Sequence, residues 1–197
     1  MRFYCWSANA EGNCVVRDFQ VRGWDNDFKL KWRLEKGQPL RGEEWDSEAV
    51  AFWDEEAQLT DLPFAVPDFE LHSPRLKALL ERFGLGGDIQ YLPIRIVGQK
   101  TGREVSTYYV ANYLRRIACL SLEHSIYTVF GPDWLRPEQR GQISGVLKPV
   151  LRGDAVGEAR LFRVDEYEYI VVIREDVKRA MEEAGITGCW YRELEVV

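Results

Sequence analysis

The stretch from Ile89 to Tyr113 most narrowly limits how this chain can fold. Two extended segments, "IQYLPIRIVG" and "REVSTYYVANYL", are joined by a short turn between Gly98 and Gly102. Apolar and aromatic residues occur at both alternating sets of positions in the second segment, so both of its faces are expected to be partly covered. Two such segments joined by a short turn predict a β-hairpin, and therefore a fold built around a sheet.

Two other segments are typical of helices that pack on a sheet. In "SPRLKALLERFG", which spans 73–84, Ser73 suits the N-cap, Pro74 the first helical position and Gly84 the left-handed end. Its apolar residues recur at helical spacing, at Leu76, Leu79, Leu80 and Phe83. The segment 174–185, "REDVKRAMEEAG", repeats this spacing and also ends in glycine.

Short apolar runs elsewhere in the chain indicate strands. They are "RFYCWS" and "NCVVRDFQV" near the N-terminus, and "GVLKPVLR", "ARLFRV", "YIVVI" and "GCWYRELEV" near the C-terminus. We expect the first forty residues to form short strands and turns, with one turn around Gly12 and Asn13. The predicted fold class is α+β, with a mainly antiparallel sheet, two principal helices (about 73–84 and 174–185) and additional short strands.

A length of 197 residues suits one compact unit. Within it we expect an acidic, strand-rich N-terminal portion (1–60) and a larger α+β portion (61–197). No run of about 18 apolar residues that could cross a membrane occurs, and the opening "MRFYCWSANAEG" lacks the apolar stretch of a secretory signal. We therefore expect a cytoplasmic protein that does not act on membranes.

Between Gly42 and Pro74 the chain has ten carboxylates and no lysine or arginine. The carboxylates of this acidic run are Glu43, Glu44, Asp46, Glu48, Asp54, Glu55, Glu56, Asp61, Asp68 and Glu70. Such a run repels nucleic acid and favours a basic protein partner, because it raises the rate of encounter. Carboxylate clusters can also bind metal ions, but the run lacks the spaced loop of a calcium site.

Aromatic residues within the acidic run point to an interface. Trp45, Phe52 and Trp53 lie among the carboxylates, and aromatic side chains ringed by charge are a common interface composition. The alternative is that these rings point into the core while the carboxylates face water. The candidate partner-binding residues are Glu43, Glu44, Trp45, Asp46, Trp53, Asp54, Glu55 and Glu56.

The stretch "CLSLEHS", from Cys119 to Ser125, suggests a cysteine nucleophile activated by His124. Residues five apart point to opposite faces of a strand and lie about 140° apart around a helix, so neither structure brings the two together. We expect a structural cysteine and an exposed His124 in a loop. A cysteine-dependent hydrolase that uses Cys119 and His124 stays open as an alternative.

The remaining sequence offers no other chemical signature. The four cysteines form no CxxC pair and the histidines, His72 and His124, are far apart, so no metal site is expected. Cys5 and Cys14 could pair across a hairpin, but a disulfide does not suit a cytoplasmic protein. Phosphate-binding loops, dinucleotide fingerprints and nucleophile elbows do not occur. We expect no catalytic residues and no cofactor.

An ordered series of segments covers residues 61–197: "SPRLKALLERFGL", "IQYLPIRI", "YYVAN", "CLSLEHS", "LFRV" and "YIVVIREDVKRAMEEAGITGCWY". In this order they resemble a bacterial immunity-protein family of polymorphic toxin systems, immunity family eleven. The resemblance implies a cytoplasmic protein that binds and neutralises a toxin made by the same cell or a sibling, and it implies no catalytic residue.

The leading hypothesis is therefore stoichiometric inhibition of a cognate toxin, which we expect to be basic. Nucleic acid, membranes and cofactors are not expected to take part. A regulatory or scaffold protein unconnected to a toxin stays open beside the hydrolase.

Overall fold

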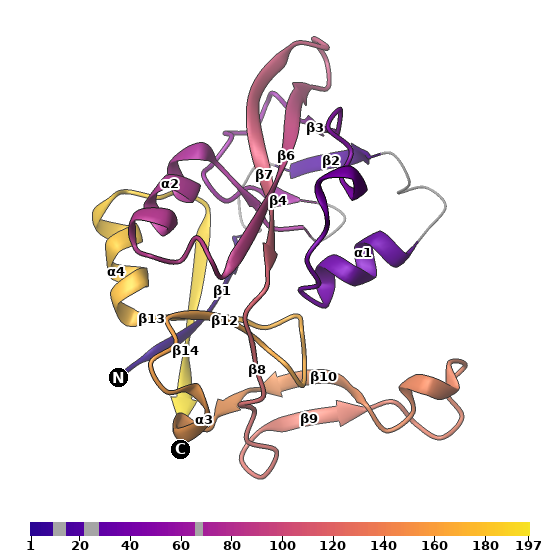
Figure 1. The fold of residues 1–197 in the computed structure, drawn as a ribbon, viewed down its shortest axis with the longest axis vertical. Helices are drawn as coiled ribbons and strands as arrows, with labels where there is room; N and C mark the ends of the chain where they lie inside the picture. The colour runs from indigo at the N-terminus through magenta and orange to yellow at the C-terminus, as the bar shows by residue number, and fades with distance from the viewer. Residues whose placement is uncertain (10–14, 22–27, 66–68) are drawn as a thin grey trace.

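The computed structural model describes residues 1–9, 15–21, 28–65 and 69–197 (Figure 1). Three features considered from the sequence lie outside the described residues: the turn around Gly12 and Asn13, Cys14, and Asp68 of the acidic run. The fold is α+β and mostly sheet, as predicted, and most of the described strand pairings are antiparallel.

Strands make up most of the described elements. In chain order they are β1 (Phe3–Ala8), β2 (Val15–Gln20), β3 (Val50–Trp53), β4 (Phe64–Ala65), β5 (Leu71–His72), β6 (Ile89–Gly98), β7 (Glu104–Tyr113), β8 (Arg116–Ile117), β9 (Ile126–Val129), β10 (Ile143–Lys148), β11 (Val150–Leu151), β12 (Leu161–Val164), β13 (Val171–Arg174) and β14 (Cys189–Val196). The helices are α1 (Phe28–Glu35), α2 (Pro74–Arg82), α3 (Gly153–Val156) and α4 (Glu175–Glu183), and the short 3₁₀ helices are η1 (Gly42–Glu44) and η2 (Pro137–Gln139).

The first sheet is built around the predicted hairpin. β6 and β7 pair antiparallel from Ile89 opposite Tyr113 to Val97 opposite Glu104, and they form a long ribbon (Figure 1). The strand order of this sheet is β4-β2-β3-β6-β7-β5. β3 pairs in parallel with β6, which places the acidic run beside the hairpin.

The second sheet combines the two ends of the chain, in the order β11-β14-β1-β13-β12-β8. β1 lies between β13 and β14 and is antiparallel to both, with Tyr4 opposite Ile173 on one side and Glu193 on the other. The next strand, β2, belongs to the first sheet, so the chain passes from one sheet to the other after Ala8. An N-terminal strand is thus an inner member of a sheet otherwise made from residues 116–196.

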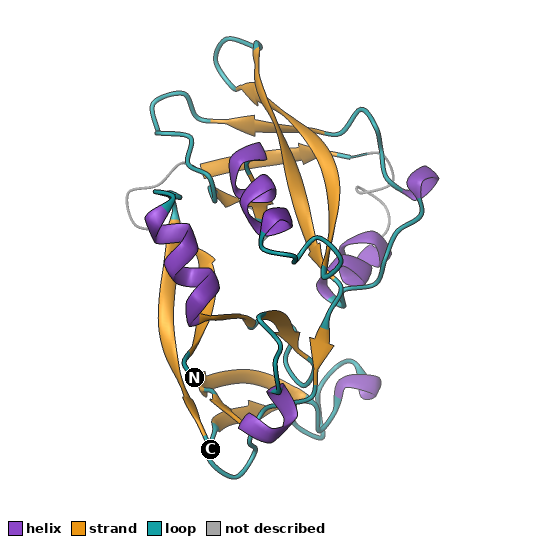
Figure 2. Ribbon diagram, turned by 60° about the vertical axis from the view of Figure 1, so that its left-hand side comes forward, coloured by secondary structure: helices purple, strands orange, loops and turns teal. Residues whose placement is uncertain are grey.

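Both predicted helices form, and they pack against each other (Figure 2). α2 contacts the first sheet and α4 contacts the second. The Ser73 hydroxyl accepts the Leu76 amide at 3.1 Å, which confirms the N-cap, and Gly84 and Gly185 follow the helices at φ of 79° and 65°. Arg75 of α2 donates a hydrogen bond to the carbonyl oxygen of Gly185 at 3.2 Å, so the end of α4 is tied to α2.

One apolar core joins the two sheets and the two helices. Its buried members include Tyr4, Trp6, Leu62, Leu76, Leu80, Tyr113, Ile173 and Met181. A second apolar cluster packs on the first sheet and includes Ile94. A third packs on the second sheet and includes Phe162. Because burial of apolar surface is the main favourable term in folding, the joint core couples the two sheets energetically.

Residues 28–35 correct the expectation of strands and turns near the N-terminus, because they form helix α1. The sequence "FKLKWRL" alternates apolar and basic residues, a pattern typical of a strand. In the helix Leu30 and Leu34, four residues apart, pack on the core, and Trp32 stays 50% exposed. Lys31 forms an ion pair with Glu35 at 3.5 Å. Tertiary packing therefore overrides the strand-like alternation of apolar and basic residues in this segment.

Candidate partner-binding surface and buried charged pocket

The predicted partner-binding residues follow β6 along the first sheet. Glu43 and Glu44 belong to η1, near the start of β6, and Asp54–Glu56 come directly after β3, near the turn between β6 and β7. The contacts of the two groups with β6 are five residues apart, or about 16 Å along a strand. The structure therefore places the residues in two groups, 43–46 and 53–56, instead of one cluster.

The tryptophans of these groups face inward to different degrees. Trp45 is 8% exposed and its indole N–H donates to the Pro93 carbonyl oxygen at 2.8 Å, so its ring belongs to the core. Trp53 is half-buried and its N–H donates to the Ala57 carbonyl oxygen at 3.1 Å. Phe52 is also half-buried. For Trp45 the core alternative therefore holds.

Several carboxylates of the acidic run are already engaged within the molecule. Glu44 accepts a hydrogen bond from Arg33 of α1 at 2.6 Å, and this contact and the Arg41 amide lower the pKa of Glu44 to about 2. Glu55 accepts the backbone amides of Lys100 and Thr101, each at 2.9 Å, which lower its pKa to about 2. Glu55 thus holds the turn of the β6–β7 hairpin.

Basic residues from outside the run offset further charges. Arg95 of β6 lies 3.2 Å from Glu48, and Lys100 pairs with Glu56. Each nearby positive charge cancels part of the negative potential of a carboxylate. The negative electrostatic potential over the acidic run is therefore weaker than its sequence suggests. Glu43 is exposed and forms no ion pair with any residue that the structure describes.

Asp61 leaves the surface and joins the two halves of the fold. Its carboxylate accepts the Ser73 hydroxyl at 2.6 Å, the Thr187 amide at 3.0 Å and the Thr187 hydroxyl at 3.1 Å. Ser73 caps α2, and Thr187 precedes β14. A carboxylate with three such donors is a structural junction between the sheets.

Glu70 enters the space between the sheets and meets two other titratable side chains. The Tyr113 hydroxyl donates to the Glu70 carboxylate and lies 2.9 Å from Nε2 of His72. Burial raises the pKa of Glu70 to about 7, although the Tyr113 hydrogen bond opposes this shift. Burial also lowers the pKa of His72 to about 3, so its imidazole is neutral at pH 7. The three side chains form one hydrogen-bonded chain, in which His72 and Tyr113 are buried and Glu70 is half-buried.

A buried cation lies beside this chain. Arg163 of β12 is 9% exposed, its guanidinium lies over the Tyr113 ring at 5.4 Å, and its Nη1 donates to the Glu168 carbonyl oxygen at 2.6 Å. The Glu168 carboxylate is paired with Lys36 instead. Among the described residues, Arg163 has no ion pair, and its Nε has no hydrogen-bond partner.

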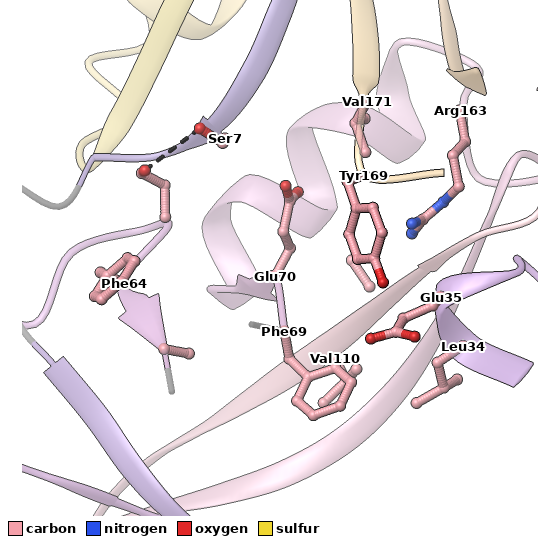
Figure 3. Close-up of a pocket in the computed structure, with 13 residues that line it drawn as sticks. Ser7, Leu34, Glu35, Phe64, Phe69, Glu70, Val110, Arg163, Tyr169 and Val171 are labelled. Atoms are coloured by element: carbon pink, nitrogen blue, oxygen red, sulfur yellow. Dashed lines mark hydrogen bonds between the residues drawn. The ribbon is translucent and has the colours of Figure 1, made fainter. Parts of the chain in front are cut away.

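Glu70 and Arg163 line a pocket of about 270 Å³ between the two sheets (Figure 3). Ser7, Arg163 and Val171 come from the second sheet, Phe64 and Val110 come from the first, and Glu35 comes from α1. Figure 3 shows the Arg163 guanidinium and the Glu35 carboxylate both directed toward the Tyr169 ring. Clefts between structural units are common ligand sites, so the pocket is a second candidate site.

The sequence alone does not predict the residues of this pocket as functional. In the sequence Glu70 is only one carboxylate of the acidic run. One signal was available for Arg163: its place inside the apolar strand "LFRV" requires a charge to be buried.

In "CLSLEHS" the structure separates the cysteine from the histidine. Cys119 is fully buried, and burial, together with the nearby Glu166, raises the pKa of its thiol to about 12. His124 is exposed, as expected, and its Nδ1 lies 2.9 Å from the Ser121 hydroxyl. A thiol with such a pKa is protonated at neutral pH and is a weak nucleophile.

The β9–β10 hairpin extends away from both sheets (Figure 1). It exposes apolar side chains, with Ile126 56%, Leu135 93% and Leu147 72% exposed. At its far end the rings of Phe130 and Trp134 lie 4.7 Å apart. Scattered exposed apolar residues are normal, but several on one projecting hairpin are typical of an interaction surface.

The described residues contain neither a metal-binding cluster nor a helix suited to cross a membrane. No group of three or more His, Cys, Asp and Glu side chains is arranged to hold a metal ion. None of the described helices combines the length and the apolar character of a membrane span.

Comparison with known proteins identifies a matching family. The model of the immunity protein family Imm11 matches residues 52–196. No curated protein matches the chain. The matched region includes most of both sheets and both long helices of the joint core, and it leaves out β1, β2 and α1.

Proposed function

Because the chain belongs to the immunity protein family Imm11, we propose that it neutralises the toxin domain of a polymorphic toxin system by binding it in a stoichiometric complex. The family match over residues 52–196 is the observation that carries this proposal. In the proposal the complex forms in the cytoplasm of the producing cell or a sibling, and no enzymatic step is required.

We assign the contact to the two acidic groups beside β6, without the core residue Trp45. The exposed side chains there support this choice, since Glu43 is exposed and Glu56 is 76% exposed. Trp53 lies between the carboxylates and supplies a half-buried aromatic surface. Contact patches commonly combine such an aromatic residue with a charged rim.

The acidic groups favour a basic toxin. Charges at the rim of an interface act mainly on the rate of association, and salt screens them over about 10 Å at 0.1 M. Because Arg33, Arg95 and Lys100 already offset part of the charge, we expect a moderate dependence on salt.

A titration of toxin activity tests the proposal and separates it from enzymatic protection. The proposal predicts that a toxin with a variable C-terminal domain is encoded beside the gene for this chain, and that domain is the probe. Stoichiometric binding predicts complete inhibition at one equivalent, a 1:1 complex in solution, and rescue of a host that co-expresses both proteins. Absence of rescue would refute the proposal, and inhibition by a tenth of an equivalent would favour an enzyme that modifies the toxin.

The burial of Cys119 and the exposure of His124 argue against the cysteine hydrolase. The scaffold alternative differs from immunity in its partner. If the protein binds a neighbour-encoded protein that is harmless when expressed alone, the scaffold function is favoured.

A further inference from the structure

The pocket between the sheets presents a buried guanidinium, that of Arg163, which forms no contact ion pair with any described residue. Arg163 stays cationic at neutral pH, although burial lowers its pKa, because an arginine side chain holds its proton very strongly. Its partners in the described structure are a backbone carbonyl and an aromatic face, and the Glu168 carboxylate is paired with Lys36 instead. Burying a cation without a counter-ion is costly.

The two carboxyl groups of the pocket do not neutralise Arg163 by contact. Neither Glu35 nor Glu70 forms an ion pair with it in the described structure. Glu35 pairs with Lys31 at the rim. Glu70 is bonded to Tyr113, and its raised pKa allows it to take up a proton, so it can donate to an anion instead of repelling it.

The remaining walls are mostly apolar. Leu34, Phe64, Val110 and Val171 line the pocket, together with the alanines Ala8 and Ala65. These side chains offer contact area to a hydrocarbon body and no further charge. Binding sites for small molecules commonly combine such walls with a few polar groups that set the orientation.

We propose that this pocket binds a small ligand that carries one carboxylate on an apolar body, with the carboxylate on Arg163 and the body between the two sheets. The Ser7 hydroxyl and the Tyr169 ring lie at the same pocket and can complete the polar end. The binding does not depend on the toxin, so it extends the proposed function without resting on it.

Calorimetric titration with hexanoate tests the proposal, with hexan-1-ol and hexylamine as neutral and cationic counterparts. Hexanoate is expected to bind at one site, at least about tenfold more tightly than either counterpart, because a hydrogen bond to a charged group contributes about tenfold to a hundredfold in affinity. Preference for hexylamine would assign the pocket to Glu35 and Glu70 and overturn the proposal. Absence of saturable hexanoate binding would also overturn it.

Two variants locate the site. Arg163→Gln should weaken hexanoate binding about tenfold or more, while Arg103→Gln, on the exposed hairpin turn, should leave it unchanged. Ala8→Leu keeps every charge and fills part of the pocket from a half-buried position, so it should also weaken binding. If Arg163→Gln does not fold, Ala8→Leu decides the question. Undiminished hexanoate binding by folded Ala8→Leu would contradict the assignment.

Discussion

The Tyr113 hydroxyl donates a hydrogen bond to the Glu70 carboxylate in the buried space between the two sheets. The same hydroxyl is within hydrogen-bonding distance of His72. Gain or loss of a proton at Glu70 therefore affects His72 through the Tyr113 hydroxyl. Three titratable groups with shifted pKa values are therefore concentrated where the sheets meet.

Replacing Glu70 by glutamine should change how stability depends on pH. Because burial raises the pKa of Glu70 from 4.5 to about 7, its contribution is full below pH 4.5 and is lost as the pH rises through 7. The stability of wild type relative to Glu70→Gln should fall over this window, by up to about 3 kcal/mol. Urea unfolding at several pH values measures this difference, and a flat difference curve would contradict the assignment.

His72 should act in the opposite direction. Its pKa is lowered from 6.5 to about 3, so its contribution is lost as the pH falls below 6.5 and the unfolded chain takes up a proton. In wild type the two trends oppose each other between pH 4.5 and 6.5. The Glu70→Gln variant should therefore lose stability on acidification more steeply than wild type, which the same unfolding series shows.

Asp61→Ala should be strongly destabilising. The substitution leaves Ser73 and two Thr187 donors without their acceptor at a site that is 9% exposed. We expect a loss of about 3 kcal/mol or more in the free energy of unfolding, measured by urea titration. Asp133→Ala, at an exposed position of the β9–β10 hairpin, is the matched control and should change stability by less than about 0.5 kcal/mol.

Gly188→Ala should destabilise the fold more than Gly102→Ala. Both glycines have positive φ, at 83° and 65°, so both variants carry backbone strain of about 1 kcal/mol. A Cβ at Gly188 would lie 2.4 Å from the Leu62 carbonyl oxygen, whereas a Cβ at Gly102 would meet nothing within 4 Å. Thermal unfolding of both proteins isolates the clash, and equal melting temperatures would show that the loop before β14 adjusts freely.

Charge reversal at Glu43 and Glu56 should slow association with the toxin. We choose these positions because Glu55 holds a turn and its reversal would disturb the hairpin. The double variant should reduce the association rate several-fold at low salt and much less at 0.5 M salt, with a smaller effect on dissociation. Stopped-flow or surface-based kinetics measure both rates, and an unchanged association rate at low salt would exclude steering by these residues.

Cys119→Ala should leave protection against the toxin intact, because the thiol is buried and its high pKa keeps it protonated. In the folded protein a thiol reagent should modify Cys119 far more slowly than after denaturation. Loss of host rescue by a folded Cys119→Ala variant would instead favour the hypothesis of a cysteine-dependent hydrolase.

Local signals were enough to predict α2, α4 and the β6–β7 hairpin. Each is specified within about a dozen residues by a cap, a glycine end or a turn, as Ser73 and Gly84 illustrate for α2. α1 was misread because its apolar residues alternate like those of a strand. Only the packing of Leu34 on distant strands decides between the two structures.

Contacts between residues far apart in the chain could not be predicted from the sequence. The charges that offset the acidic run come from Arg33 before it and from Arg95 and Lys100 after it, so the run looks more exposed in sequence than in space. Likewise, Glu70 and Arg163 are far apart in the chain, and only the meeting of the two sheets makes them one pocket.

The inner position of β1 delays completion of the second sheet during synthesis. Its partners β13 and β14 include Ile173 and Glu193, so β1 must wait unpaired until residues 171–196 have been synthesised. At usual rates of translation this wait lasts roughly 10 to 40 s. During that interval Trp6, later fully buried, has no sheet to cover it. A newly made molecule therefore completes its second sheet only after β14 has left the ribosome.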